Sequence, residues 1–284
     1  MSQFNLTLKP AQIQIVLRSG GKFVQAYDVI NNSSETVQLS SSISTWIPAD
    51  NLGTVTYTED STPLQFSLSN ADLKLGQDFL LKPGQKRQLV LKIINPSSEE
   101  KDYYLTFFVT QKPVSDTNTN RQNFAKLGSH ILISTTQQTS FPSELEVYQF
   151  FINPTIKDVF IPLKISGEIF NNGNHYSQID GQITISKNGQ TYWQQNLFPY
   201  TVTSQNSRLI QCLTPNNEVT SCQLNAPIWP GKYQGTITLT GNASKYEYSF
   251  NFFVFPYSLI FIILFIFLLL SFLLRKKQTP SSRK

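Results

Sequence analysis

The two histidines, His130 and His175, are the first candidates for acid–base chemistry. A nucleophilic serine needs a histidine base and an acid that orients it, often beside a Gly-x-Ser-x-Gly turn. No such turn or matched acid accompanies either histidine. His130 falls where a polar loop meets an expected strand, and His175 falls in an asparagine-rich turn. We therefore expect exposed or capping histidines in a protein that is not an enzyme.

Carboxylates could serve a glycosidase or bind a cation. A glycosidase uses two carboxylates, and the run Glu99 to Asp102 supplies acids, but its position predicts a solvated hairpin tip. Asp50, Glu59 and Asp60 lack the spacing of a known calcium loop. The chain also has no glycine-rich loop that would hold a phosphate. We expect no cofactor and no metal.

The only two cysteines, Cys212 and Cys222, are separated by nine residues that include the turn signal Pro215-Asn216-Asn217. A disulfide that closes a hairpin fits this spacing and an oxidising exterior. Two free thiols are the alternative. A zinc site is not expected, because neither histidine has the required spacing to the cysteines.

Trp46, Trp193 and Trp229, together with 21 Phe and 12 Tyr, offer two interpretations. Aromatic side chains could line a carbohydrate-binding face. In a β-sandwich they more often fill the core.

The elements that must position these residues are strands. Short runs of Thr, Ser, Val, Ile, Tyr and Phe alternate with Asn, Gly, Pro and Ser clusters, which is the all-β pattern. We expect two immunoglobulin-like β-sandwich domains followed by a single transmembrane α-helix. The expected limits are residues 1–137 and 144–255 for the sandwiches, 138–143 for the linker, 256–274 for the helix and 275–284 for a basic cytoplasmic tail.

Some elements have particularly clear signals. Asn188-Gly189 is the best hairpin signal, because this pair suits a type I′ turn. Pro10 marks an edge or a bend in the first strand region, Leu6–Leu17. Residues Val114–Lys126 are polar and predict a long exposed loop, and Val159–Ile165 predict a strand.

The stretch Tyr257 to Leu274 has 18 residues without a charge, interrupted only by Ser258, Ser271 and the tyrosine itself. As a helix it would reach ~27 Å, close to the ~30 Å hydrocarbon thickness of a bilayer. A buried core helix is the alternative. The lack of a polar face and the basic residues that follow at once favour a membrane anchor.

Five basic residues and no acid follow this stretch, beginning with Arg275, Lys276 and Lys277. The chain has 23 Lys and Arg against 18 Asp and Glu, so residues 1–274 carry 18 of each sign. This balance gives no hint of the basic face that nucleic-acid binding needs. The positive-inside rule places the tail in the cytoplasm and the folded body outside the cell membrane.

That orientation requires a secretion signal, whereas Met1 to Asn5 is polar and strand-like. We expect that a signal peptide has been removed. The alternative is a tail-anchored protein with its body in the cytosol, which would put the basic tail on the side that the positive-inside rule disfavours.

Two pairs of segments resemble a known family. Asn31–Val37 with the Pro-Gly-Gln turn in Leu81–Gln85 resembles immunoglobulin-like domains related to periplasmic pilus chaperones. It also resembles the peptidoglycan-binding domain of bacterial WxL-interacting surface proteins. Asn172-Gly173-Asn174 with Gly181–Ile185, and later Pro230–Tyr233, is similar to the membrane-proximal domain of those surface proteins.

The resemblance implies surface attachment, with the outer domain touching cell-wall polymer and the inner domain touching a partner protein. It transfers no individual binding residue. For the basic pair on which the strand-donating groove of pilus chaperones depends, Lys9 and Arg18 are only candidates.

Together these patterns predict a membrane-anchored cell-surface binding or scaffold protein that attaches to cell-wall polymer or to a surface protein. The alternative is a membrane-tethered chaperone that lends a β-strand to a secreted subunit or receives one from it. An open sheet edge in the first domain would favour that alternative. A surface enzyme is the third class.

Overall fold

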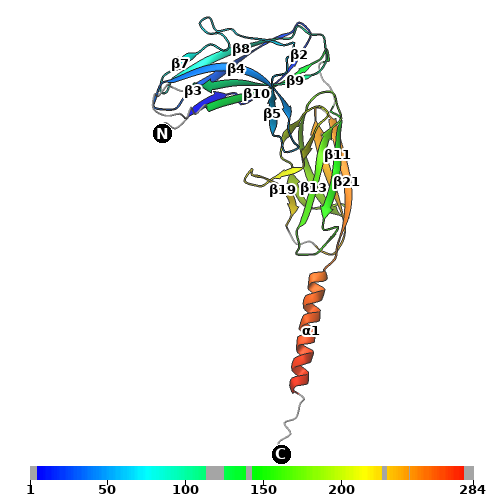
Figure 1. Cartoon of the computed structure of the whole chain (residues 1–284). Helices are drawn as coiled ribbons and strands as arrows, with labels where there is room; N and C mark the ends of the chain where they lie inside the picture. The colour runs from blue at the N-terminus through cyan, green and yellow to red at the C-terminus, as the bar shows by residue number, and fades with distance from the viewer. Residues whose placement is uncertain (1–4, 113–124, 139–142, 226–228, 243, 278–284) are drawn as a thin grey trace, which may run out of the picture. The chain divides into compact units, whose positions relative to one another are not determined.

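The structure is a computed structural model that describes residues 5–112, 125–138, 143–225, 229–242 and 244–277. The chain folds as two compact units (Figure 1). Unit 1 comprises Met1–Phe141, Gly173–Tyr176 and Thr203–Asn206, and unit 2 comprises Pro142–Asn172, Ser177–Val202 and Ser207–Lys284. Each unit contains two β-sheets, and unit 2 continues into helix α1 (Tyr257–Lys277). The predicted all-β class with a C-terminal apolar helix is confirmed.

Unit 1 is built from two sheets. The strands of the first, in spatial order, are β1 (Leu6–Lys9), β3 (Lys22–Asn31), β8 (Lys86–Ile94) and β6 (Gln65–Leu68). The second runs β2 (Gln12–Leu17), β10 (Ala125–Thr135), β9 (Asp102–Gln111), β4 (Val37–Pro48) and β5 (Val55–Thr58), with β7 (Phe79–Leu81) also on β4. The chain crosses from one sheet to the other at Pro10, where the sequence predicts an edge or a bend.

The core of unit 1 lies between these sheets. Alternate side chains of β8 and β9 have no exposed surface, namely Leu89, Leu91, Ile93, Leu105, Phe107 and Val109. Tyr27 of β3 stacks on Phe107 with 4.7 Å between ring centroids. Each fully buried aliphatic or aromatic side chain stabilises the fold by roughly 1.5–3 kcal/mol relative to an exposed one. This packing fixes the register of β9 and β10, on which the polar network described below depends.

Unit 2 is also built from two sheets. The first runs β11 (Leu145–Asn153), β13 (Leu163–Asn171), β19 (Val219–Leu224) and β18 (Gln211–Leu213), with β17 (Ser207–Leu209) on β13. The second runs β12 (Ile156–Lys157), β21 (Ser244–Val254), β20 (Gly231–Gly241), β14 (Ser177–Lys187) and β15 (Gln190–Asn196), with β16 (Tyr200–Val202) on β14.

The hairpin between β14 and β15 confirms the type I′ prediction. Its central residues Asn188 and Gly189 have φ values of 51° and 79°. This turn needs positive φ at both positions, which asparagine tolerates and glycine adopts without steric cost.

Other expectations differ from the structure. Residues 159–162 are not a strand, because Asp158 accepts the N–H of Phe160 and turns the chain before β13 begins at Leu163. Ala125 and Lys126 belong to β10 and not to a loop. Most of the predicted loop and linker, residues 113–124 and 139–142, lies outside the described residues.

Candidate functional sites

The apolar segment forms the helix that the sequence predicts. Within α1, Tyr257–Leu274 is long and apolar enough to cross a membrane, and none of it is buried inside the structure. The backbone of Arg275, Lys276 and Lys277 continues the same helix. These observations are consistent with a single-pass anchor followed by a basic tail.

The start of the helix is tied to unit 2 by hydrogen bonds. Only Phe255 and Pro256 separate β21 from α1 (Figure 1). Phe255 N donates to Lys157 O at 2.9 Å, and Ser258 N donates to Asp158 Oδ2 at 2.9 Å. A carboxylate that accepts an N–H of the first turn is a helix cap. Asp158 lies 100 residues from Ser258, so sequence reasoning could not have identified this cap.

Lys157 and Asp158 are both buried at this junction. Lys157 Nζ donates to Asp158 O at 2.9 Å and to Val159 O at 3.3 Å. Burial lowers the pKa of Lys157, and the nearby Asp158 charge opposes that shift. Burial disfavours the ionised Asp158, but the N–H groups of Phe160 and Ser258 outweigh it and hold the pKa of that carboxyl below its usual value. The cap is therefore an anion at neutral pH.

Exposed apolar side chains flank the junction. They come from β12, from the loop before β13 and from the end of β21: Ile156, Phe160, Ile161, Phe253 and Phe255. Trp229 belongs to the same end of unit 2, because Gly231 pairs with Val254, and Trp229 is 79% exposed. Trp and Tyr concentrate at the level of lipid headgroups in membrane proteins, so the position of Trp229 fits such an interface.

The two cysteines form a disulfide within the β18–β19 hairpin, with 5.0 Å between their Cα atoms. Both are fully buried in the core of unit 2. Cys222 pairs with Ile165 of β13, and Cys212 forms a bridge with Leu197 beyond β15. The disulfide thus links the two strands of the hairpin, and backbone pairing joins the hairpin to β13 and to Leu197.

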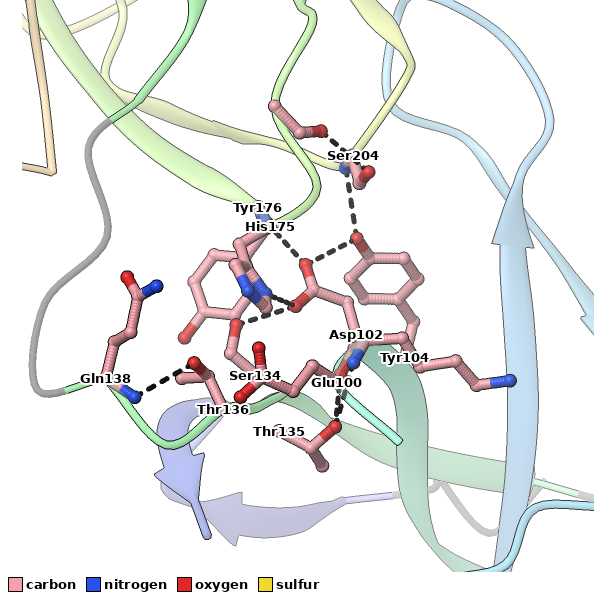
Figure 2. A network of polar contacts seen from close by, with 12 residues as sticks. Glu100, Asp102, Tyr104, Ser134, Thr135, Thr136, Gln138, His175, Tyr176 and Ser204 are labelled. Atoms are coloured by element: carbon pink, nitrogen blue, oxygen red, sulfur yellow. Dashed lines mark hydrogen bonds and ion pairs between the residues drawn. The ribbon is translucent and has the colours of Figure 1, made fainter. Parts of the chain in front are cut away.

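Unit 1 contains a polar network centred on Asp102 (Figure 2). The run Glu99–Asp102 is not wholly a solvated tip, because the Asp102 side chain is only 3% exposed. Ser134 Oγ donates to Asp102 Oδ1 at 2.7 Å and Tyr104 Oη donates to Oδ2 at 2.9 Å. His175 Nδ1 lies 2.8 Å from Oδ1, and Tyr176 N donates to Oδ2. His175 therefore does have an acid partner, 73 residues away in sequence.

The order of these contacts favours a structural role. In a hydrolase the imidazole lies between the hydroxyl and the acid, so that it can take the hydroxyl proton. Here the Asp102 carboxylate lies between Ser134 and His175, and the hydroxyl donates to the acid. Burial, together with the Asp102 charge, raises the pKa of Tyr176 to about 12 and that of Tyr104 further. Both phenols are therefore neutral at physiological pH, and Tyr104 donates its hydroxyl proton to Asp102.

His130 lies inside β10 and not at a loop junction, because β10 begins at Ala125. Its Nδ1 is 3.0 Å from Thr106 Oγ1, and its ring meets Trp46 edge-on. Burial lowers the pKa of His130 below 6.5, so the ring is neutral at neutral pH. It is a packed side chain and not an exposed one.

The candidate aromatic and cation-binding residues Trp46 and Asp50 have structural partners. Trp46 is buried, stacks on Tyr104 and donates Nε1–H to Leu105 O at 2.9 Å. Asp50 Oδ1 accepts three backbone N–H groups of its own turn. Within the described residues, no group of three His, Cys, Asp or Glu side chains is arranged to hold a metal ion.

Unit 1 presents an uncharged strand at the end of a sheet. β2 (Gln12–Leu17) is the terminal strand of its sheet and contains neither a charge nor a proline. It runs parallel to β10 over His130–Thr135. Ala11 O accepts from His130 N, and Leu17 O accepts from Thr136 N, so these two residues face β10. Because the backbone groups of successive residues point to opposite edges of a strand, the N–H of Val16 faces the outer edge. Such an edge is a template for pairing with another strand.

No protein-family model matches the chain, and no curated protein matches it in sequence. Similar solved structures are PapD-like, immunoglobulin-like domains of the pilus-chaperone type. The E. coli chaperone DraB is 13% identical, with a TM-score of 0.39 over 86% of this chain and 98% of its own. The CsuC–CsuE chaperone–tip adhesion subunit pre-assembly complex of Acinetobacter baumannii is 11% identical, with a TM-score of 0.38. The match covers 86% of this chain and 97% of the other.

A PapD-like domain of human CEP192 is 12% identical, with a TM-score of 0.33, and covers 47% of this chain and 86% of its own.

Proposed function

We propose that the chain is a membrane-anchored cell-surface binding or scaffold protein that presents two β-sandwiches for attachment to cell-wall polymer or to a protein partner. The observation that carries the proposal is the junction at Asp158. The second sandwich caps the first turn of an apolar helix through a buried carboxylate, with two residues between strand and helix. Such a junction holds the sandwich close to the segment that would enter the bilayer.

Three further features support the orientation. The body carries as many acidic as basic residues, whereas the tail after Leu274 is basic. The buried Cys212–Cys222 disulfide fits an oxidising compartment. The exposed Trp229 at the same end of unit 2 suits the headgroup region of a membrane. The proposal retains the domain limits expected from the sequence and the resemblance to WxL-interacting surface proteins, and it involves no catalytic step.

Protease treatment of intact cells tests this orientation. Protease should remove residues 1 to about 250 and leave a fragment that contains the helix and tail, while a cytosolic marker protein survives. A body that is degraded only after the cells are lysed would contradict the proposal and restore the tail-anchored alternative.

A second candidate function is that of a membrane-tethered assembly factor, and the terminal strand β2 favours it. The change Val16→Pro removes the outward-facing N–H and leaves the bonds of Ala11 and Leu17 to the neighbouring segment in place. Val16→Thr keeps the N–H and is the matched control. If β2 pairs with secreted subunits, Val16→Pro should reduce their amount in the medium and Val16→Thr should not. Equal secretion in wild type and both variants would eliminate this candidate.

A further inference from the structure

Unit 2 contains an open groove of about 710 Å³ between β15 and the disulfide hairpin β18–β19. Trp193, Gln194 and Gln195 of β15 form one wall, and the hairpin forms the other. The disulfide holds the hairpin wall, since Cys212 and Cys222 are buried directly behind it. The groove is thus bounded by two elements that the core fixes.

The lining is polar but uncharged. Of its twelve residues, six are Asn or Gln, three are Ser or Thr, and the others are Trp193, Leu213 and Pro215. Neutral amides both donate and accept hydrogen bonds, whereas an ionic ligand would require charges of opposite sign. The composition therefore favours a neutral ligand rich in groups that donate and accept.

Gln195 joins β15 to the hairpin. Its Nε2 donates to Leu213 O at 3.0 Å, which fixes the orientation of the side-chain amide. Its Oε1 is fully buried and has no hydrogen-bond partner among the described residues, so a ligand in the groove cannot contact this atom. Hydrogen bonds to a ligand fall to the exposed amides of the lining, such as Asn196 and Asn217.

Trp193 stands two residues from Gln195 on β15, so the two side chains leave the same face of the strand. Trp193 is half-buried and packs against the core of unit 2, which restricts its ring. A fixed aromatic face beside hydrogen-bonding amides matches a sugar ring, which has an apolar C–H face and a hydroxyl edge.

We propose that this groove binds a neutral polysaccharide, with Trp193 against a sugar ring and the exposed amides of the lining hydrogen-bonded to sugar hydroxyls. This deepens the proposed function, on which it rests for the position of unit 2 outside the membrane. It places polymer binding on the second sandwich, whereas the family resemblance implies the first.

The test is binding of the full chain in lipid nanodiscs to the neutral probes dextran, mannan and chitotetraose, measured by calorimetry. Dextran sulfate, which has the backbone of dextran with added charge, is the ionic comparison. We expect at least one neutral probe to bind with a Kd near or below about 1 mM, and dextran sulfate to bind no better than dextran. Absence of neutral binding, or preference for the sulfated polymer, overturns the proposal.

Variants locate the binding. Trp193→Ala should weaken binding by about tenfold or more, whereas Trp229→Ala, which removes a 79% exposed tryptophan outside the groove lining, should leave it unchanged. Asn196→Leu removes an exposed amide of the lining at similar volume and keeps Trp193, with exposed Gln234→Leu on β20 as its control. Binding that survives both groove variants overturns the proposal. Melting curves establish that each variant folds, and Asn196→Leu decides the matter if Trp193→Ala does not fold.

The protease experiment on intact cells is independent of this one. Sugar binding by purified protein whose body proves cytosolic would overturn the proposed orientation but leave the groove. An external body without neutral-sugar binding would overturn the groove but leave the proposed function.

Discussion

The Asp102 carboxylate receives contacts from three side chains and one backbone N–H within unit 1. Hydrogen bonds to a charged acceptor contribute about 1.5–3 kcal/mol each, and a buried group left without partners costs a comparable amount. One residue therefore orders segments that are far apart in the sequence, among them β9, β10 and Gly173–Tyr176 (Figure 2).

Asp102→Asn should lower the free energy of unfolding of unit 1 by about 2–4 kcal/mol, because either orientation of the amide presents its NH₂ to a donor. Hydrogen exchange of β9 and β10 peptides measures the loss. Glu99→Gln is the control, since Glu99 forms an exposed pair with Lys101 and should cost less than about 1 kcal/mol. Equal exchange in both variants would show that the network does not stabilise unit 1.

His130 gives unit 1 a pH dependence. Its pKa in the folded chain lies below 6.5 because burial disfavours the charged ring. The unfolded chain then binds more protons as pH falls below about 6.5, so stability decreases in that direction until the folded pKa is passed. Thermal unfolding between about pH 7 and pH 5 should show this loss, and it should be smaller in His130→Gln. An identical pH profile in the variant would contradict the assignment.

At the scale of elements, the junction between unit 2 and α1 depends on Asp158. The cap satisfies an N–H that has no partner within the helix, and its negative charge opposes the positive end of the helix dipole. The cap joins α1 to the turn after β12, which is distant in sequence.

Asp158→Ala should destabilise the first turn of α1 by about 0.5–2 kcal/mol, seen as faster hydrogen exchange near Ser258 in nanodiscs. The same loss should appear in wild type as pH falls below 3.8, because the folded pKa is depressed and the cap is lost as the carboxyl is protonated. Asp180→Asn, an exposed carboxylate on β14, is the control. Unchanged exchange in Asp158→Ala would eliminate the cap.

At the scale of the whole molecule, we propose that the charge asymmetry sets the orientation of the chain in the membrane. Replacing Arg275, Lys276 and Lys277 together by Gln should convert a population with protease-accessible bodies into a mixed one, because the basic residues nearest the helix dominate the positive-inside effect. The charge-conserving triple variant R275K/K276R/K277R is the matched control and should keep the wild-type orientation. If the body is equally accessible to protease in both variants, the tail does not set the orientation.

The amino-acid sequence by itself determined features that depend on neighbours along the chain. Alternation of apolar residues indicates strands, Asn188-Gly189 indicates a tight turn, and the uncharged stretch from Tyr257 indicates the helix. The spacing of Cys212 and Cys222 likewise indicated a hairpin disulfide. Each of these features depends on a few residues that are close together in the sequence.

The tertiary structure alone decided which distant groups meet. Asp102 with His175, and Asp158 with Ser258, are brought together by sheet order and register. The same register places Gln195 beside Leu213, with its carbonyl oxygen buried and unpartnered among the described residues. Such partners depend on packing across whole sheets, where a shift of one residue reverses the face of every side chain. Local sequence patterns do not determine the register between distant strands. The strands, the turn and the helix could therefore be predicted from the sequence, whereas the partners of Asp102 and Asp158 required the structure.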